Sequence, residues 1–370
     1  MDARRLQEQQ GLLNAAFAKS LAEIQEERHQ AAMAQIKAQS TQEAAMAQAA
    51  MDSAWAASML KVNPPLMMGT PKAPLSGPPM VALVDGDLIA YRSAAATQGT
   101  FYRIKKESTR YYKDALRIAL KYTKGDEAKA KKLIVKESNP EPLSHSVHNM
   151  KRILEGITAA MEKRYGRPVE LEVYLTADVL FRDDVTPLYK KSREGLERPA
   201  NLKGSKEWLT KTHKAQTVNG YEADDLIAMY ATDLGPTDCV IVSLDKDLRQ
   251  IPGEHYDFAK DQFETICTDS ARRNFWTQAL VGDSTDDIPG IKGVGPVTAG
   301  KILKAIEPGA EDSEFYKVVL QEWIDRTPRG EDEKDAEFYT RIIKLLSKSC
   351  KLLWLCREPE DLWSPPVTVE

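Results

Sequence analysis

The sequence predicts an α/β fold built on a parallel sheet, because short apolar runs alternate with helical stretches along its middle part. Three runs are typical of buried strands, at residues 80–84, 171–176 and 239–244. Two segments have the apolar spacing of helices, at residues 147–164 and 223–234. From about residue 275 to residue 355 the pattern is mostly helical. We therefore expect an α/β core with helices on both faces of its sheet, followed by a smaller helical subdomain.

Composition divides the 370 residues into four parts. Residues 1–62 form an Ala- and Gln-rich helical extension, since the first 60 residues contain 17 Ala, one Gly and no Pro. Residues 63–79 contain six prolines and are expected to be a linker. The core is expected over 80–270, with a basic insertion at about 100–145, and the helical subdomain over 271–370. The extension could be a solvated tail or a helix that binds a partner or itself, and composition leaves both open.

Several classes of protein are excluded by composition. The chain has no uncharged apolar run of ~18 residues, and no apolar segment follows its charged start, so neither membrane spanning nor secretion is expected. The four cysteines are scattered without a C-x-x-C pair, which argues against a zinc site or a disulfide framework. We expect a cytoplasmic protein, in the host cytoplasm if a phage encodes it. The net charge of -4 does not exclude nucleic acid, because charge is distributed unevenly.

Acidic residues follow each of the three predicted strands. Asp85 follows the first strand, Asp178 the second, and Asp245 and Asp247 the third. The carboxyl ends of parallel strands meet at one edge of a sheet, where such proteins bind their ligands. One aspartate after a strand is often only a helix cap or a turn residue, but three strands ending in this way favour a shared site.

Two further acidic clusters lie downstream. Glu222, Asp224 and Asp225 begin the helix predicted at 223–234, and Asp283 and Asp286 lie in a Gly-rich turn. Residues two apart point to different sides of a regular helix, so Glu222 and Asp224 can share a site only if the first turn is irregular. Favourable interaction with the helix dipole accounts for one or two of these acids and less readily for three.

So many carboxylates in one place would repel one another unless cations were bound. Oxygen-only ligands without EF-hand spacing favour Mg²⁺ over Ca²⁺, with Mn²⁺ as a substitute. Two such ions can act together on a phosphodiester. The acids therefore indicate metal-dependent phosphodiester hydrolysis with two bound ions.

Five motifs occur in the order found in the 5′ nuclease superfamily, which comprises flap endonucleases and 5′-3′ exonucleases, and the chain resembles that family over roughly residues 80–305. The motifs are Val84-Asp85-Gly86, Phe181-Arg182 with 187–193, Glu222-Ala223-Asp224-Asp225, Ser243-Leu244-Asp245-Lys246-Asp247 and the turn 282–290. The resemblance implies a PIN-like core. It also implies that nine acids surround the metals: Asp85, Asp178, Glu222, Asp224, Asp225, Asp245, Asp247, Asp283 and Asp286.

The resemblance also assigns basic residues to the substrate. Lys190 and Arg193 match positions that contact the scissile phosphate and join Asp85 and Asp245 as catalytic residues, with Lys191 as a further DNA contact. The segment from Thr186 to Lys214 has eight Lys or Arg and three Glu, and it corresponds to the arch of the family. It is short compared with relatives that thread single strands.

Residues 290–301 resemble the helix-hairpin-helix turn of the same family. Backbone amides around Gly293 and Gly295 would approach a duplex phosphate, with K⁺ bound there in relatives, and Lys292, Thr298 and Lys301 would also contact DNA. The same stretch satisfies G-x-x-x-x-G-K, but Ile302 replaces the Ser or Thr that would meet Mg²⁺, so an ATP site is rejected.

A second basic segment, residues 101–136, contains twelve Lys or Arg, four acids and several tyrosines. It could be an extra DNA-binding surface or a solvated helical face, placed between the first strand and the next helix.

Taken together, these features predict a 5′-3′ DNA exonuclease that acts on duplex 5′ ends in phage replication or recombination. The alternatives are a flap endonuclease, a nuclease that removes RNA primers from RNA-DNA hybrids, and a non-catalytic DNA-binding protein of the replisome.

Overall fold

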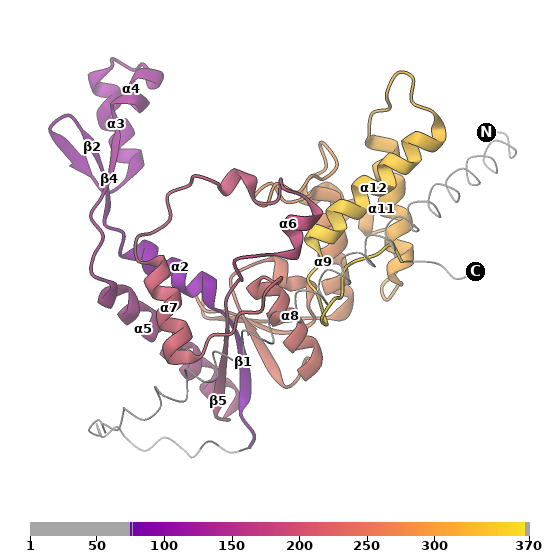
Figure 1. Cartoon of the computed structure of the whole chain (residues 1–370), viewed down its shortest axis with the longest axis horizontal. Helices are drawn as coiled ribbons and strands as arrows, with labels where there is room; N and C mark the ends of the chain where they lie inside the picture. The colour runs from indigo at the N-terminus through magenta and orange to yellow at the C-terminus, as the bar shows by residue number, and fades with distance from the viewer. Residues whose placement is uncertain (1–74, 76, 367–370) are drawn as a thin grey trace, which may run out of the picture.

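A computed structural model describes residue 75 and residues 77–366 (Figure 1). The predicted extension at 1–62 lies outside these residues, as does almost all of the linker predicted at 63–79. The mainly parallel α/β architecture predicted from the sequence is confirmed.

The central sheet has five strands in the order β5-β1-β6-β7-β8. Strands β5 (Val169–Tyr174), β1 (Met80–Asp85), β6 (Cys239–Val242) and β7 (Gly253–Asp257) are parallel, and β8 (Gln262–Ile266) is antiparallel to β7. The three strands predicted from apolar runs are β1, β5 and β6. All three therefore lie side by side, with β1 in the middle, and their carboxyl ends share one edge.

Helices cover both faces of this sheet because successive residues of a strand point in opposite directions. Ala82 and Val84 of β1 pack in one core cluster with α2 (Gly86–Ala96), α5 (Leu143–Tyr165) and α7 (Leu202–His213). Leu83 packs on the other side with α8 (Ala223–Leu234). The predicted helix at 223–234 has the observed bounds of α8, whereas the helix predicted at 147–164 begins four residues earlier, at Leu143.

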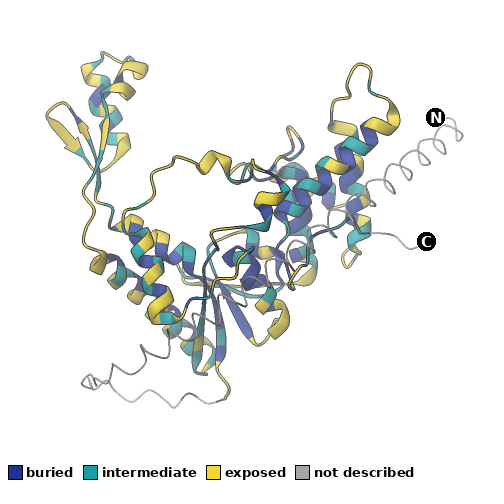
Figure 2. Cartoon of the chain, in the orientation of Figure 1, coloured by how far each residue is buried: buried dark blue, intermediate teal, exposed yellow. Residues whose placement is uncertain are grey.

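The C-terminal part is a helical subdomain, as the sequence predicts. Its helices are α9 (Thr268–Val281), α10 (Pro296–Leu303), α11 (Asp312–Arg326) and α12 (Asp335–Leu353). They bury a core of their own around Phe275, Trp276, Phe315 and Ile343. The dark blue faces in Figure 2 show this core between the helices.

The basic insertion forms a small folded unit that projects from the core (Figure 1). It contains β2 (Thr100–Ile104), β3 (Glu107–Thr109), α3 (Tyr112–Tyr122), α4 (Glu127–Leu133) and β4 (Val135–Ser138), with strand order β3-β2-β4. Ile104, Ala115, Ala119 and Ala130 form its small core. The predicted position between the first strand and the next helix is wrong, since α2 intervenes. The unit is also partly an antiparallel sheet rather than a helical face alone.

Candidate active site

Asp85 joins the end of β1 to the start of α2. Its Oδ1 accepts the Leu88 amide at 2.9 Å and caps the helix, and its Oδ2 accepts the Ser243 hydroxyl at 3.0 Å. The side chain is buried, and burial raises its pKa to about 6 despite the hydrogen bond from Leu88. A carboxylate with this pKa is costly to keep ionised without a nearby cation.

The end of β6 contributes the neighbouring acids. The Asp245 amide donates to Ser243 Oγ at 3.0 Å, and Asp245 Oδ1 accepts the Asp247 amide at 2.9 Å, as the chain enters the short helix η2 (Asp247–Gln250). Burial, followed by the charge of Asp245, raises the pKa of Asp247 to about 7. This turn therefore holds two carboxylates close enough to repel each other.

Glu222 and Asp224 reach the same edge because Glu222 lies just before α8 and does not follow the helical spacing. Glu222 is the cap residue, with extended backbone (φ -82°, ψ 162°), so it lies outside the helix proper. Burial and the charges of Asp85 and Asp245 raise the pKa of Asp224 well above its ordinary value. The electrostatic coupling places Asp224 with Asp85 and Asp245 in one acidic cluster.

Asp225 is fully buried and shares Arg182 with Glu222, whose Oε2 lies 3.5 Å from the same guanidinium. Its two oxygens accept both terminal nitrogens of the buried Arg182, at 2.5 and 2.9 Å, together with the amides of Glu222 and Cys356. Arg182 also donates to the carbonyls of Leu352 and Trp354 at the end of α12. Because all its acceptor directions are used, Asp225 is a structural anchor in this structure, and its predicted place around a metal ion stays a prediction.

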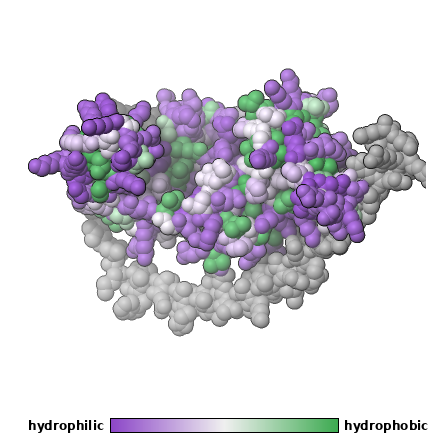
Figure 3. Space-filling model, turned by 90° about the horizontal axis from the view of Figure 1, so that it is seen from above, coloured by the Kyte–Doolittle hydropathy of each residue, from purple (hydrophilic) through white to green (hydrophobic). Residues whose placement is uncertain are grey.

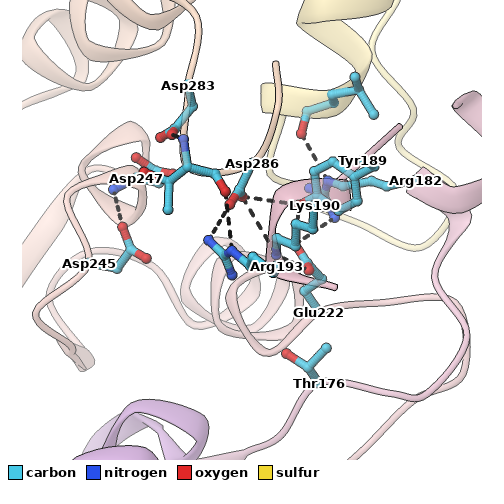
Figure 4. A network of polar contacts seen from close by, with 12 residues as sticks. Thr176, Arg182, Tyr189, Lys190, Arg193, Glu222, Asp245, Asp247, Asp283 and Asp286 are labelled. Atoms are coloured by element: carbon cyan, nitrogen blue, oxygen red, sulfur yellow. Dashed lines mark hydrogen bonds and ion pairs between the residues drawn. The ribbon is translucent and has the colours of Figure 1, made fainter. Parts of the chain in front are cut away.

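A basic segment crosses the site between α6 (Phe181–Val185) and α7, and we call residues 186–201 the strap. Lys190 Nζ contacts Glu222 and lies 3.6 Å from Asp286 Oδ2, and Arg193 pairs with Asp286. Tyr189 donates to Glu222 at 2.9 Å. Figure 4 shows Lys190 and Arg193 lying beside Glu222 and Asp286. Burial would raise the pKa of Glu222, but Arg182 and Lys190 lower it overall, so Glu222 is ionised.

The Gly-rich turn holds Asp283 and Asp286 opposite the strap. Asp283 and Ile288 exchange backbone hydrogen bonds of 2.9 and 2.8 Å, and Gly282 takes a φ of +72°. Asp283 is buried, yet its pKa is lowered because the Thr285 amide and Lys246 offset burial. Burial raises the pKa of Asp286, against the opposing charges of Lys190 and Arg193.

Asp178 and Lys191 lie apart from these contacts. Asp178 is exposed and lines a groove of about 720 Å³ with residues of the strap and α7, among them Lys203 and Lys206. Lys191 pairs with Glu194 at 2.7 Å on an exposed surface. Nothing in this geometry brings Asp178 to the acidic cluster, because the chain has already left the sheet edge after Tyr174, the last residue of β5.

Comparison with known proteins identifies the relatives of this chain. Residues 141–276 match the family model for the N-terminal resolvase-like domain of 5′-3′ exonucleases. The flap endonuclease Xni of Shewanella baltica (strain OS185) is 31% identical over 172 residues, which cover 42% of this chain and 66% of that protein. DNA polymerase I of Rhizobium leguminosarum is 43% identical over 96 residues, which are 23% of this chain and 9% of the polymerase. The chain belongs to the 5′ nuclease superfamily. The matched parts thus span just under two thirds of Xni and a small part of the polymerase.

Solved members of the 5′ nuclease superfamily resemble the chain more distantly. The T5 D15 protein, co-crystallised with metal ions, has 17% identity and a TM-score of 0.43, covering 74% of this chain and 88% of that one. The T5 5′-exonuclease with bound zinc has 18% identity and a TM-score of 0.40, covering 55% of this chain and 80% of that one.

The carboxylates at the edge of the sheet are oxygen donors of the kind that hard divalent cations prefer. Within the described residues, no three His, Cys, Asp or Glu side chains converge closely enough to hold a metal ion together. However, Asp85, Asp224 and Asp245 are carboxylates at one edge, and the pKa values of the first two are raised partly by their acidic neighbours. Hard divalent cations take oxygen ligands and keep part of their water shell, so these carboxylates fit ions of that class.

Four residues of the site were given no role by the sequence patterns. Ser243 holds Asp85, Lys246 lies 3.2 Å from Asp283, Tyr189 bridges towards Glu222, and Arg182 anchors Asp225. All four lie inside the five motifs, so their place was visible. Their partners are 33 to 158 residues away, and only the fold reveals them.

The predicted DNA-contacting turn lies between α9 and α10. Gly293 has a φ of +83°, Gly295 caps α10, and neither has an atom within 4 Å of where a Cβ would be. Lys292 and Lys301 are exposed and Thr298 is half-buried. The two glycines leave the backbone amides at the start of α10 open to approach.

No helix of the described region is long and apolar enough to cross a membrane.

Proposed function

We propose that this protein is a Mg²⁺-dependent 5′-3′ DNA exonuclease that hydrolyses phosphodiester bonds at the acidic edge of its sheet. The observation that carries the proposal is the contact between the strap and the acids: Lys190 and Arg193 reach Glu222 and Asp286 from across the site. Such an arrangement places cationic donors beside carboxylates, as hydrolysis of a charged diester requires. A role in phage DNA replication or recombination is part of this proposal.

Two clusters of carboxylates would hold the metal ions. Asp85, Asp224 and Asp245 would serve one, and Asp247, Asp283 and Asp286 the other, with Glu222 between them. When bound, divalent cations neutralise the phosphodiester, lower the pKa of the attacking water and stabilise the leaving oxygen. Mn²⁺ would substitute for Mg²⁺.

The chain itself would orient the substrate and stabilise charge. Lys190 and Arg193 donate to the carboxylates in this structure, and a bound phosphate would compete for the same donors. Ser243 fixes the rotamer of Asp85, and Lys246 holds Asp283. The amides near Gly293 and Gly295 would grip a duplex phosphate without reading sequence, with K⁺ as a further ligand of that turn.

Cleavage of 5′ flaps is a second candidate, favoured by the strap. The strap is fixed at both ends: the Lys190 amide donates to the Asp286 carbonyl at 3.0 Å, and the Ala200 amide donates to Gln98 at 2.8 Å. It passes over the site in Figure 1, as a segment bounding a single strand would. Among the relatives named above, Xni is a flap endonuclease. An RNA-DNA hybrid is a further alternative substrate.

The test is digestion of 5′-labelled blunt duplex and 5′-flap DNA with Mg²⁺, comparing wild type with Asp245→Ala. Very short products from the blunt end, absent with the variant, would support the exonuclease. Flap-length products alone would favour the endonuclease. Binding of both substrates without cleavage in Mg²⁺ or Mn²⁺ would reject both and leave a non-catalytic DNA-binding protein.

A further inference from the structure

The insertion at Thr100–Ser138, which we call the arm, is a separately packed unit whose charge the acidic site does not use. Lys106, Arg110, Lys113, Lys121, Lys124 and Lys132 are exposed, and the described residues place no carboxylate within 4.0 Å of their charged nitrogens. Its other cations are mostly paired, as Arg103 is with Glu137. The arm therefore presents a cluster of uncompensated positive charge, although the whole chain has a net charge of -4.

The cations of α3 are arranged along one side of a regular helix. Lys113, Arg117 and Lys121 follow one another at intervals of four residues, and all three are exposed. Four residues of α-helix advance by about 6 Å, so the three side chains form a row rather than a point. Arg117 pairs with Asp114 at 3.1 Å, whereas the two lysines have no carboxylate partner among the described residues. Ala115 and Ala119 on the opposite side are buried in the arm's core, which fixes the row outward. A row of cations suits a linear polyanion.

The tyrosines of the arm do not form a platform for stacking bases. Tyr122 lies under Lys105, at 4.4 Å from the ring centroid, and donates to Glu107. Tyr112 packs edge-on against Tyr102. Tyr112 and Tyr122 are each 44% exposed but have these partners, and Tyr111, 69% exposed, is the most open ring. Single-strand binding instead uses several successive aromatics that are free to stack on bases. The chemistry therefore favours contact with the phosphates of a duplex.

The arm lies on the same side of the molecule as the active site. In Figure 1 the arm and the C-terminal helices project to the same side of the sheet, with the strap between them, and Figure 3 shows mainly hydrophilic side chains over the arm from above. Lys136 and Ser138 of β4 contact Glu197 of the strap at 2.7 and 3.3 Å. Asn201 donates to Thr97 and to the Glu141 carbonyl at the base of the arm. These contacts tie the arm to the strap.

We propose that the arm binds the phosphate backbone of duplex DNA outside the acidic site and so holds the body of the substrate during hydrolysis at its end. This inference rests on the proposed function for its choice of substrate. Phosphate contacts carry no sequence preference and are strongly salt-dependent. The arm would therefore matter for long duplexes and not for those too short to reach it.

The test uses the full chain with Lys113→Gln, Lys121→Gln and Lys124→Gln combined. Its matched control is Lys163→Gln, Lys260→Gln and Lys317→Gln, three exposed lysines on other elements with the same loss of charge. Fluorescence anisotropy in EDTA would measure the affinity for blunt duplexes of increasing length over a KCl series. Circular dichroism would verify that both variants fold and melt like wild type.

The arm variant is expected to bind long duplexes at least about 10-fold more weakly at low salt. The slope of log K against log [KCl] should be reduced by ~0.9 for each phosphate that the variant no longer neutralises. The control should keep the wild-type slope. An equal loss of affinity in both variants, an unchanged slope in the arm variant, or a loss seen only with single-stranded DNA would overturn the proposal. An unchanged slope would point instead to a protein partner. If wild type cuts no DNA but the arm variant still loses binding, the proposed function fails and the arm assignment stands.

Discussion

Asp85 shows how one residue serves both the fold and the site. Its Oδ1 caps α2, and the same buried carboxyl faces the acidic cluster with a pKa raised to about 6 by burial. A carboxyl whose pKa is higher in the folded state than in the unfolded state destabilises the protein as pH rises between the two values. When no cation is bound, ionised Asp85 therefore lowers the free energy of unfolding, increasingly from pH 3.8 and in full above about pH 6. Below the unfolded pKa of 3.8 it has no effect on stability.

Asp85→Asn separates these two roles, because Asn also caps helices. Hydrolysis should fall by at least about 100-fold, since a charge beside the reacting phosphate is lost. In metal-free buffer at pH 8, the free energy of unfolding should increase by about 3 kcal/mol, taking 1.4 kcal/mol per pKa unit for a rise from 3.8 to about 6. Urea unfolding at pH 8 and pH 3.5 would measure this. A gain that persists unchanged at pH 3.5 would show that the charge is not its cause.

Lys190 is the cation best placed to act on substrate. Lys190→Ala should lower kcat by about 100- to 1000-fold, the range seen when one charge-stabilising donor is removed. Lys191→Ala, next to it but paired with Glu194 on the exposed surface, is the control and should change kcat little. Single-turnover hydrolysis at saturating enzyme would separate kcat from binding. Equal losses in both variants would indicate that the strap acts only as a general basic surface.

At the scale of elements, the buried pair of Arg182 and Asp225 joins α6 and α8 to the end of α12. Breaking a buried ion pair leaves one charge unpaired and typically costs about 3–5 kcal/mol. Asp225→Ala should lower the unfolding free energy by that amount, whereas Asp233→Ala, at an exposed position of the same helix, should cost less than about 1 kcal/mol. Chemical denaturation would measure both. A stable Asp225→Ala protein that has lost only activity would support the predicted place of Asp225 around a metal ion.

Asp287 supplies one of the hydrogen bonds that attach the strap to the Gly-rich turn. Asp287 has a φ of +59°, and its Oδ2 accepts the Ser192 amide at 2.6 Å. Asn tolerates this backbone and keeps an acceptor, while Gly keeps the backbone and loses the acceptor. Asp287→Asn should therefore remain close to wild type, and Asp287→Gly should lose several-fold in kcat/KM through a less ordered strap. Steady-state kinetics would compare them, and equal activity of the two would show that this hydrogen bond is dispensable.

At the scale of the whole molecule, every residue assigned to the site lies within 85–301. The first 60 residues are poor in bulky apolar side chains, so they have little with which to build or complete a core. Deleting them should leave the rate of hydrolysis of short duplexes within about twofold of the wild-type rate, because removal of terminal residues outside a core is usually tolerated. Gel-based digestion with the truncated chain would test this. Loss of activity by a folded truncated chain would contradict the domain division.

The sequence by itself determined three of the five strands of the sheet, the order of the acidic motifs and the family. Continuous apolar runs locate β1, β5 and β6, because strands buried on both faces are apolar at successive positions. The helical spacing of apolar residues locates α8. Both patterns are local and can be read without knowing which elements pack together. Asp85 and Asp245 were placed at one edge by the rule that parallel strands end together. The position of the arm after α2 was not anticipated, since the buried face of α2 consists largely of small residues such as Ala90, Ser93 and Ala94 and gives only a weak helical pattern.

Only the tertiary structure decided what each acid contacts. Asp224 and Asp225 are adjacent and alike in sequence, but the helix turns one to the acidic cluster and the other to Arg182. Asp178 follows a strand as Asp85 does, yet the chain carries it onto an exposed groove. The partners of these side chains are far away along the chain, so their roles depend on side-chain direction and packing between elements. No local pattern encodes that information.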